Sequence, residues 1–289
     1  MIRIGPAGNS ASFYEEGFKH TYQAAEWLFK RGLNAFEYSF GRGVNMTAET
    51  AEKIAAQMCK FDIQISAHAP YYTNLSSPED ESIKKTYDYV KRTIDAVKTL
   101  GGNRVVVHPG SLCKQTRQTA FARAEKSMAG LMEYLDRECA GVDADSGFLV
   151  CIETMGKMGQ IGTVNEVLQL AAPYKNATVC IDFGHVNCTT QGGLKTKDDY
   201  RHVLDLSFEK LGEERAKNIH IHFSKIMYGK SGELKHLTFA DNVYGPEFDT
   251  LAPLIHEYKM QPVIICESDG TMAEDAMYIK AMLNKKHKL

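Results

Sequence analysis

The chain alternates short apolar stretches with amphipathic segments along its whole length, and this alternation restricts its fold more than any other feature. Stretches rich in β-branched residues predict strands, and apolar residues at helical spacing predict helices between them. We expect strands at 2–5, 35–40, 63–67, 104–107, 148–152, 178–181, the start of 218–236, and 262–266. We expect helices at about 13–31, 47–60, 78–100, 116–139, 164–172, 197–211, 247–258 and 272–284. Eight strand–helix units of this size predict an α/β fold, a closed (β/α)8 TIM barrel with a parallel sheet.

The length and composition are consistent with one domain. The chain has 289 residues, a size that α/β barrels reach as a single unit, and its 44% of apolar residues can fill a large core. No stretch rich in proline, glycine or serine divides the chain. We therefore predict a single TIM-barrel domain over residues 1–289.

Charge and cysteine usage limit the partners and the compartment. The formal net charge of −2 gives no overall attraction to nucleic acid, so DNA binding would depend on local lysine and arginine residues or on bound cations. The seven cysteines form no C-x-x-C pair, which is typical of a reducing compartment. The N-terminus lacks a basic region followed by an apolar one, and no apolar run is long enough to span a bilayer. We expect a cytoplasmic monomer without membrane contact.

Ionisable residues occupy the carboxyl ends of six different predicted strands. These residues are His68, His108, Glu153, Asp182, His220 and Glu267, and His185 lies one helical turn after Asp182. In a barrel the carboxyl ends of the strands meet at the face that carries active sites. One such residue alone is more often a hydrogen-bonded core or cap residue. Burying six in one barrel mouth would cost on the order of several kcal/mol each without compensating cations, so the set predicts a metal centre.

The stretch 218–236 is the densest in potential metal ligands. It carries His220, His222, Glu233 and His236. Strand alternation puts His220 and His222 on one face. Three histidines and a carboxylate at a strand end and its following loop predict part of a metal site that other strands complete.

Six short motifs, taken in order, resemble the successive signatures of the endonuclease IV family. They are SAHAPYYTNL at 66–75, VVVHPGS at 105–111, CIETMGKMGQIG at 151–162, CIDFGHVN at 180–187, HIHFSK at 220–225 and CES at 266–268. The resemblance extends over nearly the whole chain. It implies a TIM-barrel apurinic/apyrimidinic endonuclease with three zinc ions, on a scaffold shared with xylose isomerase-type sugar isomerases and epimerases.

The resemblance also implies a ligand set for each zinc ion. The first ion would be held by His68, His108 and Glu153; the second by Glu153 as a bridge, Asp182, His220 and Glu267; and the third by His185, His236 and an aspartate two residues before His236. At that aspartate position this chain has Leu234, which cannot bind a metal, and Glu233 is the alternative ligand. His222 is an additional candidate, either as a ligand or as a core residue that supports one. Mixed histidine and carboxylate ligands also accept manganese in place of zinc.

The implied reaction is hydrolysis of the phosphodiester 5′ to an abasic site in DNA, which leaves a 3′-hydroxyl. Two bridged divalent ions acidify a water and bind the attacking and leaving oxygens. Glu153 and Glu267 are the predicted catalytic residues, and Glu267 could position the water. The candidate DNA contacts are Tyr71, Asn74, Arg42 and Lys225, with Lys230 and Lys235 as further phosphate ligands.

Two other functions remain open on the same barrel. Glu153, Asp182, His220 and Glu267 alone resemble the single-metal site of a sugar isomerase or epimerase, in which two glutamates shuttle a proton. The histidine pair on strands three and four argues against that, because it supplies ligands for another ion. A metal-stabilised binding protein without nuclease activity is the third hypothesis, motivated by Leu234 and by the unfamiliar loop around Arg42. The fold cannot decide among the three.

Overall fold

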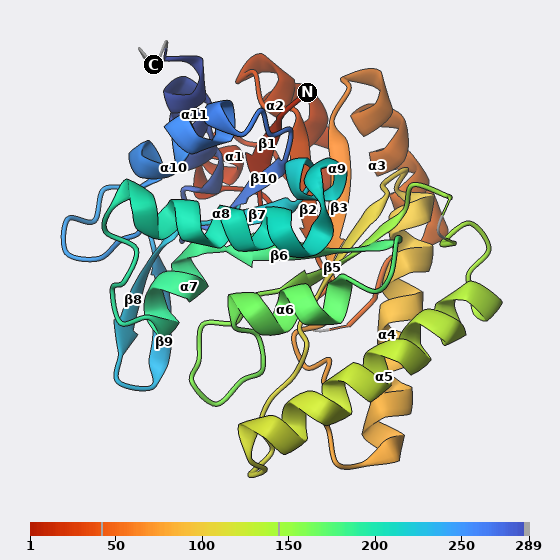
Figure 1. Ribbon diagram of the computed structural model, residues 1–289. Coiled ribbons are helices and arrows are strands. Elements are labelled where there is room, and N and C mark those ends of the chain that lie inside the picture. Colours follow the sequence, from red (N-terminus) through yellow and green to blue (C-terminus); the bar gives the residue numbers. More distant parts are fainter. Residues whose placement is uncertain (42, 144, 286–289) are drawn as a thin grey trace.

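A computed structural model describes residues 1–41, 43–143 and 145–285. Its central element is an eight-stranded parallel sheet with the strand order β1-β10-β7-β6-β5-β4-β3-β2 (Figure 1). These strands are β1 Arg3–Pro6, β2 Ala35–Ser39, β3 Gln64–His68, β4 Arg104–Val107, β5 Leu149–Glu153, β6 Ala177–Asp182, β7 His220–Phe223 and β10 Val263–Cys266. The two outer strands of that order also meet, since Gly8 N donates to Glu37 O at 2.9 Å and Asn34 N donates to Ile4 O at 3.0 Å. The sheet is therefore a nearly closed barrel, and the predicted (β/α)8 fold is confirmed.

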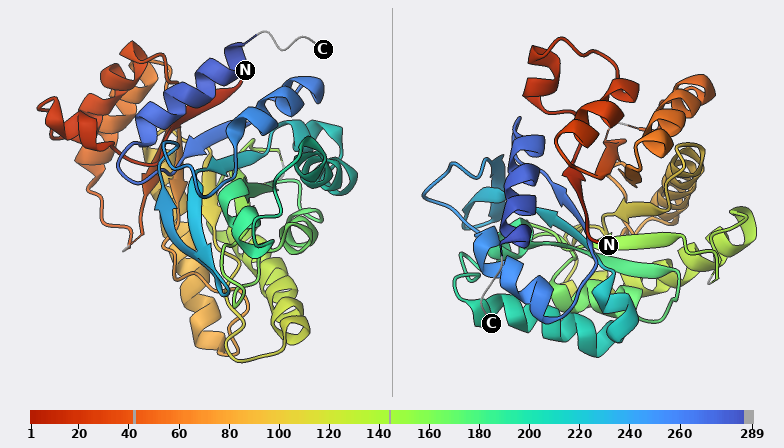
Figure 2. Two further views of the ribbon diagram at one scale, coloured as in Figure 1. Left: turned by 90° about the vertical axis from the view of Figure 1, so that its left-hand side faces the viewer. Right: turned by 90° about the horizontal axis from the view of Figure 1, so that it is seen from above.

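Helices surround the barrel, as the view from above shows (Figure 2). They are α1 Ala11–Glu15, a 3₁₀ turn at Thr21–Gln23, α2 Ala24–Lys30, α3 Ala48–Lys60, α4 Asp80–Thr99, α5 Arg117–Glu138, α6 Val164–Ala171, α7 Phe183–Thr189, α8 Lys197–Leu211, α9 Glu213–Lys217, α10 Phe248–Glu257 and α11 Met272–Asn284. The helix predicted at 13–31 is wrong as one element, because Gly17 has a φ of 89° and breaks it. None of the described helices is long and apolar enough to cross a membrane.

Threonine side chains begin several of these helices. The hydroxyl oxygens of Thr47, Thr116, Thr163 and Thr196 each accept a hydrogen bond from a backbone N–H in the first turn. At Thr163 the bond is reciprocal, because the Glu166 carboxylate accepts from the Thr163 backbone N–H. Such caps satisfy N–H groups that have no partner inside the helix, which explains where the helices start.

The barrel interior changes from apolar to polar toward the carboxyl ends of the strands. Near the amino ends Ala35, Val263 and Ile265 pack together. A further apolar cluster is formed by Val106, Cys151 and Cys180. Beyond these clusters the inward-facing residues are mostly histidines and carboxylates. The amino end of the barrel is closed by apolar packing and by the buried Arg104, whose Nη1 donates to Asn218 O at 2.9 Å, so the histidines and carboxylates are accessible from the opposite mouth.

One element has no counterpart in the predicted eight units. An antiparallel hairpin of β8, Lys225–Gly229, and β9, Gly232–Leu237, follows β7 directly and lies beside α7 (Figure 1). The residues we expected in a loop after strand seven therefore have a fixed backbone. This matters because β9 carries two of the candidate metal ligands.

Candidate metal centre

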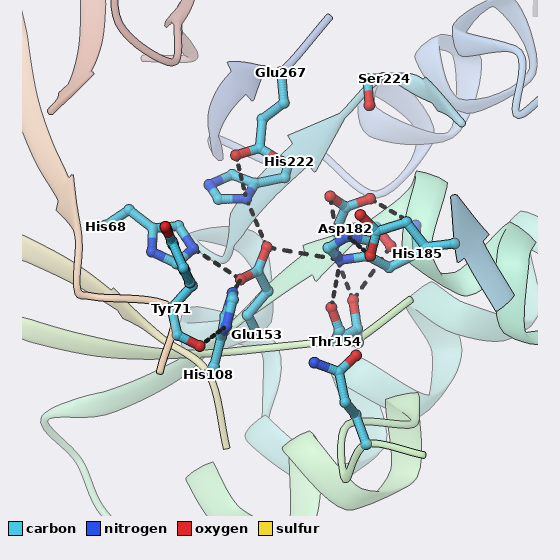
Figure 3. Close-up of polar contacts among 12 residues, drawn as sticks. His68, Tyr71, His108, Glu153, Thr154, Asp182, His185, His222, Ser224 and Glu267 are labelled. Carbon is cyan, nitrogen blue, oxygen red and sulfur yellow. Dashed lines mark hydrogen bonds and ion pairs between the residues drawn. The ribbon is translucent and has the colours of Figure 1, made fainter. Parts of the chain in front are cut away.

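The first group of candidate ligands joins β3, β4 and β5. His68 ends β3, His108 follows β4, and Glu153 ends β5. The Nε2 atoms of His68 and His108 lie 3.0 and 2.9 Å from Glu153 Oε2. Their Nδ1 atoms lie 2.7 Å from Ala69 O and 3.2 Å from Tyr71 O, and since a carbonyl only accepts, each Nδ1 donates. Both rings are thus oriented with Nε2 toward Glu153 (Figure 3).

The second group shares Glu153 with the first. Ligand atoms of Glu153, Asp182, His222 and Glu267 all lie within 4.8 Å of one another. His222 Nδ1 is 2.8 Å from Glu153 Oε1 and 3.5 Å from Glu267 Oε1. Glu153 therefore faces the two histidines of the first group with one oxygen and His222 with the other (Figure 3). This is the arrangement of a bridging carboxylate between two cation positions.

The third group lies where α7 meets the hairpin. His185 Nε2 is 3.5 Å from Glu233 Oε2, and His236 Nε2 is 3.7 Å from Glu233 Oε1. The other ring nitrogens are occupied, since His185 Nδ1 lies 2.8 Å from Thr154 O and His236 Nδ1 lies 2.8 Å from Ser224 Oγ. The three residues predicted for the third ion therefore lie together. The Nε2 atoms of His185 and His236 both face the Glu233 carboxylate.

A β-bulge explains how Glu233 reaches this group. In the hairpin Tyr228 pairs with Glu233 and Met227 with Lys235, so Leu234 is the extra residue and has no partner. An extra residue shifts the alternation of the strand by one position. Glu233 and His236, three residues apart, consequently lie on the same face, while the Leu234 side chain is 65% exposed. The Glu233 backbone N–H also donates to Gly156 O at 2.8 Å, which anchors it to the loop after β5.

The structure corrects the placement of His220. We expected His220 beside Asp182 and Glu267, but the register of β6 and β7 pairs Asp182 with His222 and Cys180 with His220. Both histidines point into the barrel, but His220 lies one inward-facing position deeper. Its burial lowers its pKa to about 4, so the ring is neutral. His222, which we ranked lower, occupies the place at the mouth.

Sequence reasoning missed Glu37 altogether. It lies in the middle of β2 between Phe36 and Tyr38, and its fully buried carboxylate contacts both histidines of β7. The signal was a charged residue inside an otherwise apolar strand, at the alternation that faces the interior.

The candidate DNA contacts have different environments. Lys225 is only 5% exposed; its Nζ donates to Asp241 O at 2.7 Å and lies 2.7 Å from a Glu247 carboxylate oxygen. Its ammonium group is therefore paired within the protein and is not available to bind a phosphate, contrary to the role we expected. Asn74 accepts hydrogen bonds from Ser76 and Ser111, so it organises two loops at the mouth.

Tyr71 is 56% exposed at the edge of the centre, so its ring is accessible to a ligand. Lys230 and Lys235, at the hairpin, are also exposed. Arg42 lies outside the described residues. The exposed candidates thus lie on the loops and the hairpin that surround the three groups.

The electrostatics of the centre suit cations. Contacts with histidines outweigh the effect of burial and hold the pKa of Glu153 well below its usual value, whereas burial raises the pKa of Glu267. Burial alone would lower the pKa of His68, but its contact with Glu153 raises it to about 9. Asp182 Oδ2 is buried and has no hydrogen-bond partner among the described residues. Imidazole nitrogens and carboxylate oxygens in groups of three and four fit divalent metal ions, and an ion would satisfy that oxygen.

A cavity of about 370 Å³ opens onto all three groups. It is lined by His68, His108, Glu153, His185, Glu233, His236, Glu267 and Tyr71, among others. A second cavity of about 490 Å³ adjoins it and shares Ser39, His68, His236 and Glu267. The centre is thus accessible from the barrel mouth.

Comparison with known proteins places this barrel in a family. A model of the xylose isomerase-like TIM barrel family matches residues 25–283. The chain belongs to this family. It is 30% identical over 270 residues to a Methanocaldococcus jannaschii protein named "Uncharacterized protein MJ0133", covering 93% of this chain and 92% of the relative. It is 24% identical over 276 residues to the probable endonuclease 4 of Bacillus subtilis, covering 91% of this chain and 86% of that protein.

Solved structures share the barrel fold. Endonuclease IV from Thermus thermophilus superposes with a TM-score of 0.67 at 20% identity, covering 92% of this chain and 94% of that one. A D-tagatose 3-epimerase-like protein superposes with a TM-score of 0.66 at 19% identity, covering 88% of each chain. Likeness at these identities shows the fold alone. The resemblance to endonuclease IV is confirmed by the relatives of that name, and the choice of reaction depends on the site.

Proposed function

We propose that this xylose isomerase-like barrel is a metal-dependent apurinic/apyrimidinic endonuclease of DNA repair. The observation that carries the proposal is the shared carboxylate of Glu153. One of its oxygens faces His68 and His108 and the other faces His222, so the chain offers adjacent positions for two ions. A single-metal enzyme has no use for the first of these positions.

The three groups would hold zinc ions, with manganese as the alternative. Bound there, divalent ions would supply Lewis acidity toward a phosphodiester and would acidify water. The residues of the chain fix this geometry, because carbonyl or hydroxyl oxygens engage the outward ring nitrogens of four histidines: His68, His108, His185 and His236. Glu267 lines both cavities and would orient the attacking water.

Exposed aromatic and lysine side chains around the barrel mouth would bind DNA. Tyr71 lines the cavity of the centre, its neighbour Tyr72 is also exposed, and exposed aromatic rings stack on bases. Lys157 and Lys235, which line the cavities, and Lys230, at the turn of the hairpin, are exposed and would bind phosphates. The relatives named endonuclease 4 support the same substrate. With seven free cysteines, we further propose a monomer in the reducing cytoplasm.

The test is incision of duplex DNA that bears one abasic site by zinc-loaded and manganese-loaded protein. We expect cleavage 5′ to the site with a 3′-hydroxyl that a polymerase extends, and about three ions per chain. His68→Ala and His108→Ala are expected to abolish incision and to lower the metal content by one ion. Absence of incision above these variants, with a metal content near one, would refute the proposal.

The second candidate function is a sugar isomerase or epimerase. It is favoured by the group of Glu153, Asp182, His222 and Glu267, which could serve a single ion, and by the fold of the epimerase-like neighbour. It predicts that ketoses exchange a carbon-bound proton in heavy water and that His68→Ala has little effect. About three ions with neither incision nor exchange would instead support a binding protein.

A further inference from the structure

Glu37 lies opposite the metal centre in the barrel wall. Its strand β2 is separated from β7 by β1 and β10 on one side and by four strands on the other. Its side chain nevertheless reaches the interior face of β7 and is only 1% exposed. A buried carboxylate is costly unless its oxygens have charged or hydrogen-bonding partners.

The partners of Glu37 are two histidines and a serine. Glu37 Oε1 lies 2.9 Å from His222 Nε2, and Oε2 lies 3.0 Å from His220 Nε2. Ser66 Oγ donates to Oε2 at 2.7 Å. The carboxylate thus ties β2, β3 and β7 together through the barrel interior. The residue that links this deeper layer to the proposed metal centre is His222.

The His222 ring lies between two sets of carboxylates. Nε2 faces Glu37, whereas Nδ1 faces Glu153 at 2.8 Å and Glu267 at 3.5 Å. An imidazole can bind a metal through one nitrogen while its other N–H is held by a carboxylate, and this contact fixes the ring orientation and makes the metal-binding nitrogen more basic. Nδ1 is the nitrogen that faces Glu153 and Glu267, whereas Nε2 faces Glu37, so Glu37 is on the side that would keep the proton.

We propose that Glu37 is a positioning residue that holds His222 from across the barrel, so that Nδ1 is presented to a metal ion bound with Glu153, Asp182 and Glu267. This inference rests on the metal centre of the proposed function. The stability of the fold does not by itself explain why a carboxylate occupies position 37. The same interior contains the apolar Val106 and Cys151, and apolar residues usually replace buried ion pairs without loss of stability.

The test measures metal binding in three variants of Glu37. Glu37→Leu removes the carboxylate, Glu37→Asp keeps the charge but shortens the reach, and Glu37→Gln keeps the length and one acceptor oxygen. Val106→Ala is the control, because it makes a cavity in the same interior without removing a polar contact. Affinity is measured by zinc titration against a competing chelator, and the ligand geometry by the visible spectrum of the cobalt-substituted protein.

We expect Glu37→Leu and Glu37→Asp to bind one ion about 10- to 100-fold more weakly, with an altered cobalt spectrum. Glu37→Gln should lose clearly less metal affinity. Val106→Ala should have a lower melting temperature but the metal affinity and cobalt spectrum of the wild type. If Glu37→Leu does not fold, the comparison of metal affinity and cobalt spectrum between Glu37→Asp and Glu37→Gln tests the inference. Wild-type affinity and spectrum in Glu37→Asp, or an equal loss in Val106→Ala, would overturn the inference while the metal centre stands. A wild-type protein that binds no divalent ion would overturn both.

Discussion

Replacing His222 and His220 one at a time gives the sharpest test of the metal centre, because both lie on β7 and contact the same carboxylate, but His222 also faces Glu153 and Glu267. Both are fully buried on β7, and both contact the Glu37 carboxylate, at 2.9 and 3.0 Å. His222→Asn removes one partner of a buried ion pair with Glu37 and Glu153, which costs about 3–5 kcal/mol, whereas His220→Asn removes a neutral ring from its contact with Glu37, which costs about 1–3 kcal/mol. Both variants should therefore lose stability, and His222→Asn should lose more.

Their metal affinities should differ. Structural four-ligand zinc sites gain about 10–16 kcal/mol, so one ligand contributes roughly 3 kcal/mol, or on the order of 100-fold in affinity. We expect His222→Asn to lose about this much for one ion and His220→Asn to stay within about threefold of wild type. Elemental analysis after dialysis against chelator measures the metal, and thermal melting followed by circular dichroism measures stability. Loss of the ion in His220→Asn with retention in His222→Asn would refute the assignment and restore the expectation from sequence.

Three further changes test the surroundings of the centre. In Gly156→Ala the new Cβ would lie 2.8 Å from Glu233 Cβ, so we expect the metal content to fall by one ion in a folded protein; an unchanged content would contradict the tight contact. Leu234→Asp should add no ligand and should not rescue Glu233→Leu, because the side chain at 234 faces solvent; recovery of the ion would contradict the bulge. Glu166→Gln should lower the free energy of unfolding by about 1–2 kcal/mol at neutral pH, since the carboxylate accepts from Arg117 and two backbone N–H groups. These bonds hold the pKa of Glu166 below its ordinary 4.5, so the difference should shrink as pH falls below 4.5; a constant difference in denaturant melts at pH 7 and pH 3 would contradict this.

The fold was predictable because each strand–helix unit carries its own local signal. The helices expected at 197–211 and 272–284 are found at Lys197–Leu211 and Met272–Asn284. The exceptions are places where local patterns do not report the backbone. Apolar spacing continues past Gly17, so the break between α1 and α2 was not visible. The short helix α7 begins because Asp182 Oδ1 accepts from His185 N at 2.8 Å, a cap that we had read only as a pair of ligands.

The part of the site that is formed by the carboxyl ends of the strands could be predicted from the sequence. Parallel strands bring their carboxyl ends together, so His68, His108, Glu153 and Glu267 could be grouped without knowing any contact. The depth of a side chain within the barrel could not be predicted in the same way. Strand alternation indicates which residues face inward, but it does not indicate which of them lies at the mouth. That depth is set by pairing with the neighbouring strand, and the pairing of β6 with β7 selects His222 over His220.

The bulge at Leu234 bears on which function the barrel retains. The apparent absence of a ligand two residues before His236 motivated the hypothesis of a binding protein that has lost the third ion. A regular strand would indeed turn a residue three positions before His236 to the opposite face. The unpaired Leu234 restores the alignment, so Glu233 faces both His185 and His236. The bulge thus places a carboxylate beside both histidines. With the third group intact, that motive for a lost activity disappears, and the multinuclear hydrolase becomes the stronger hypothesis.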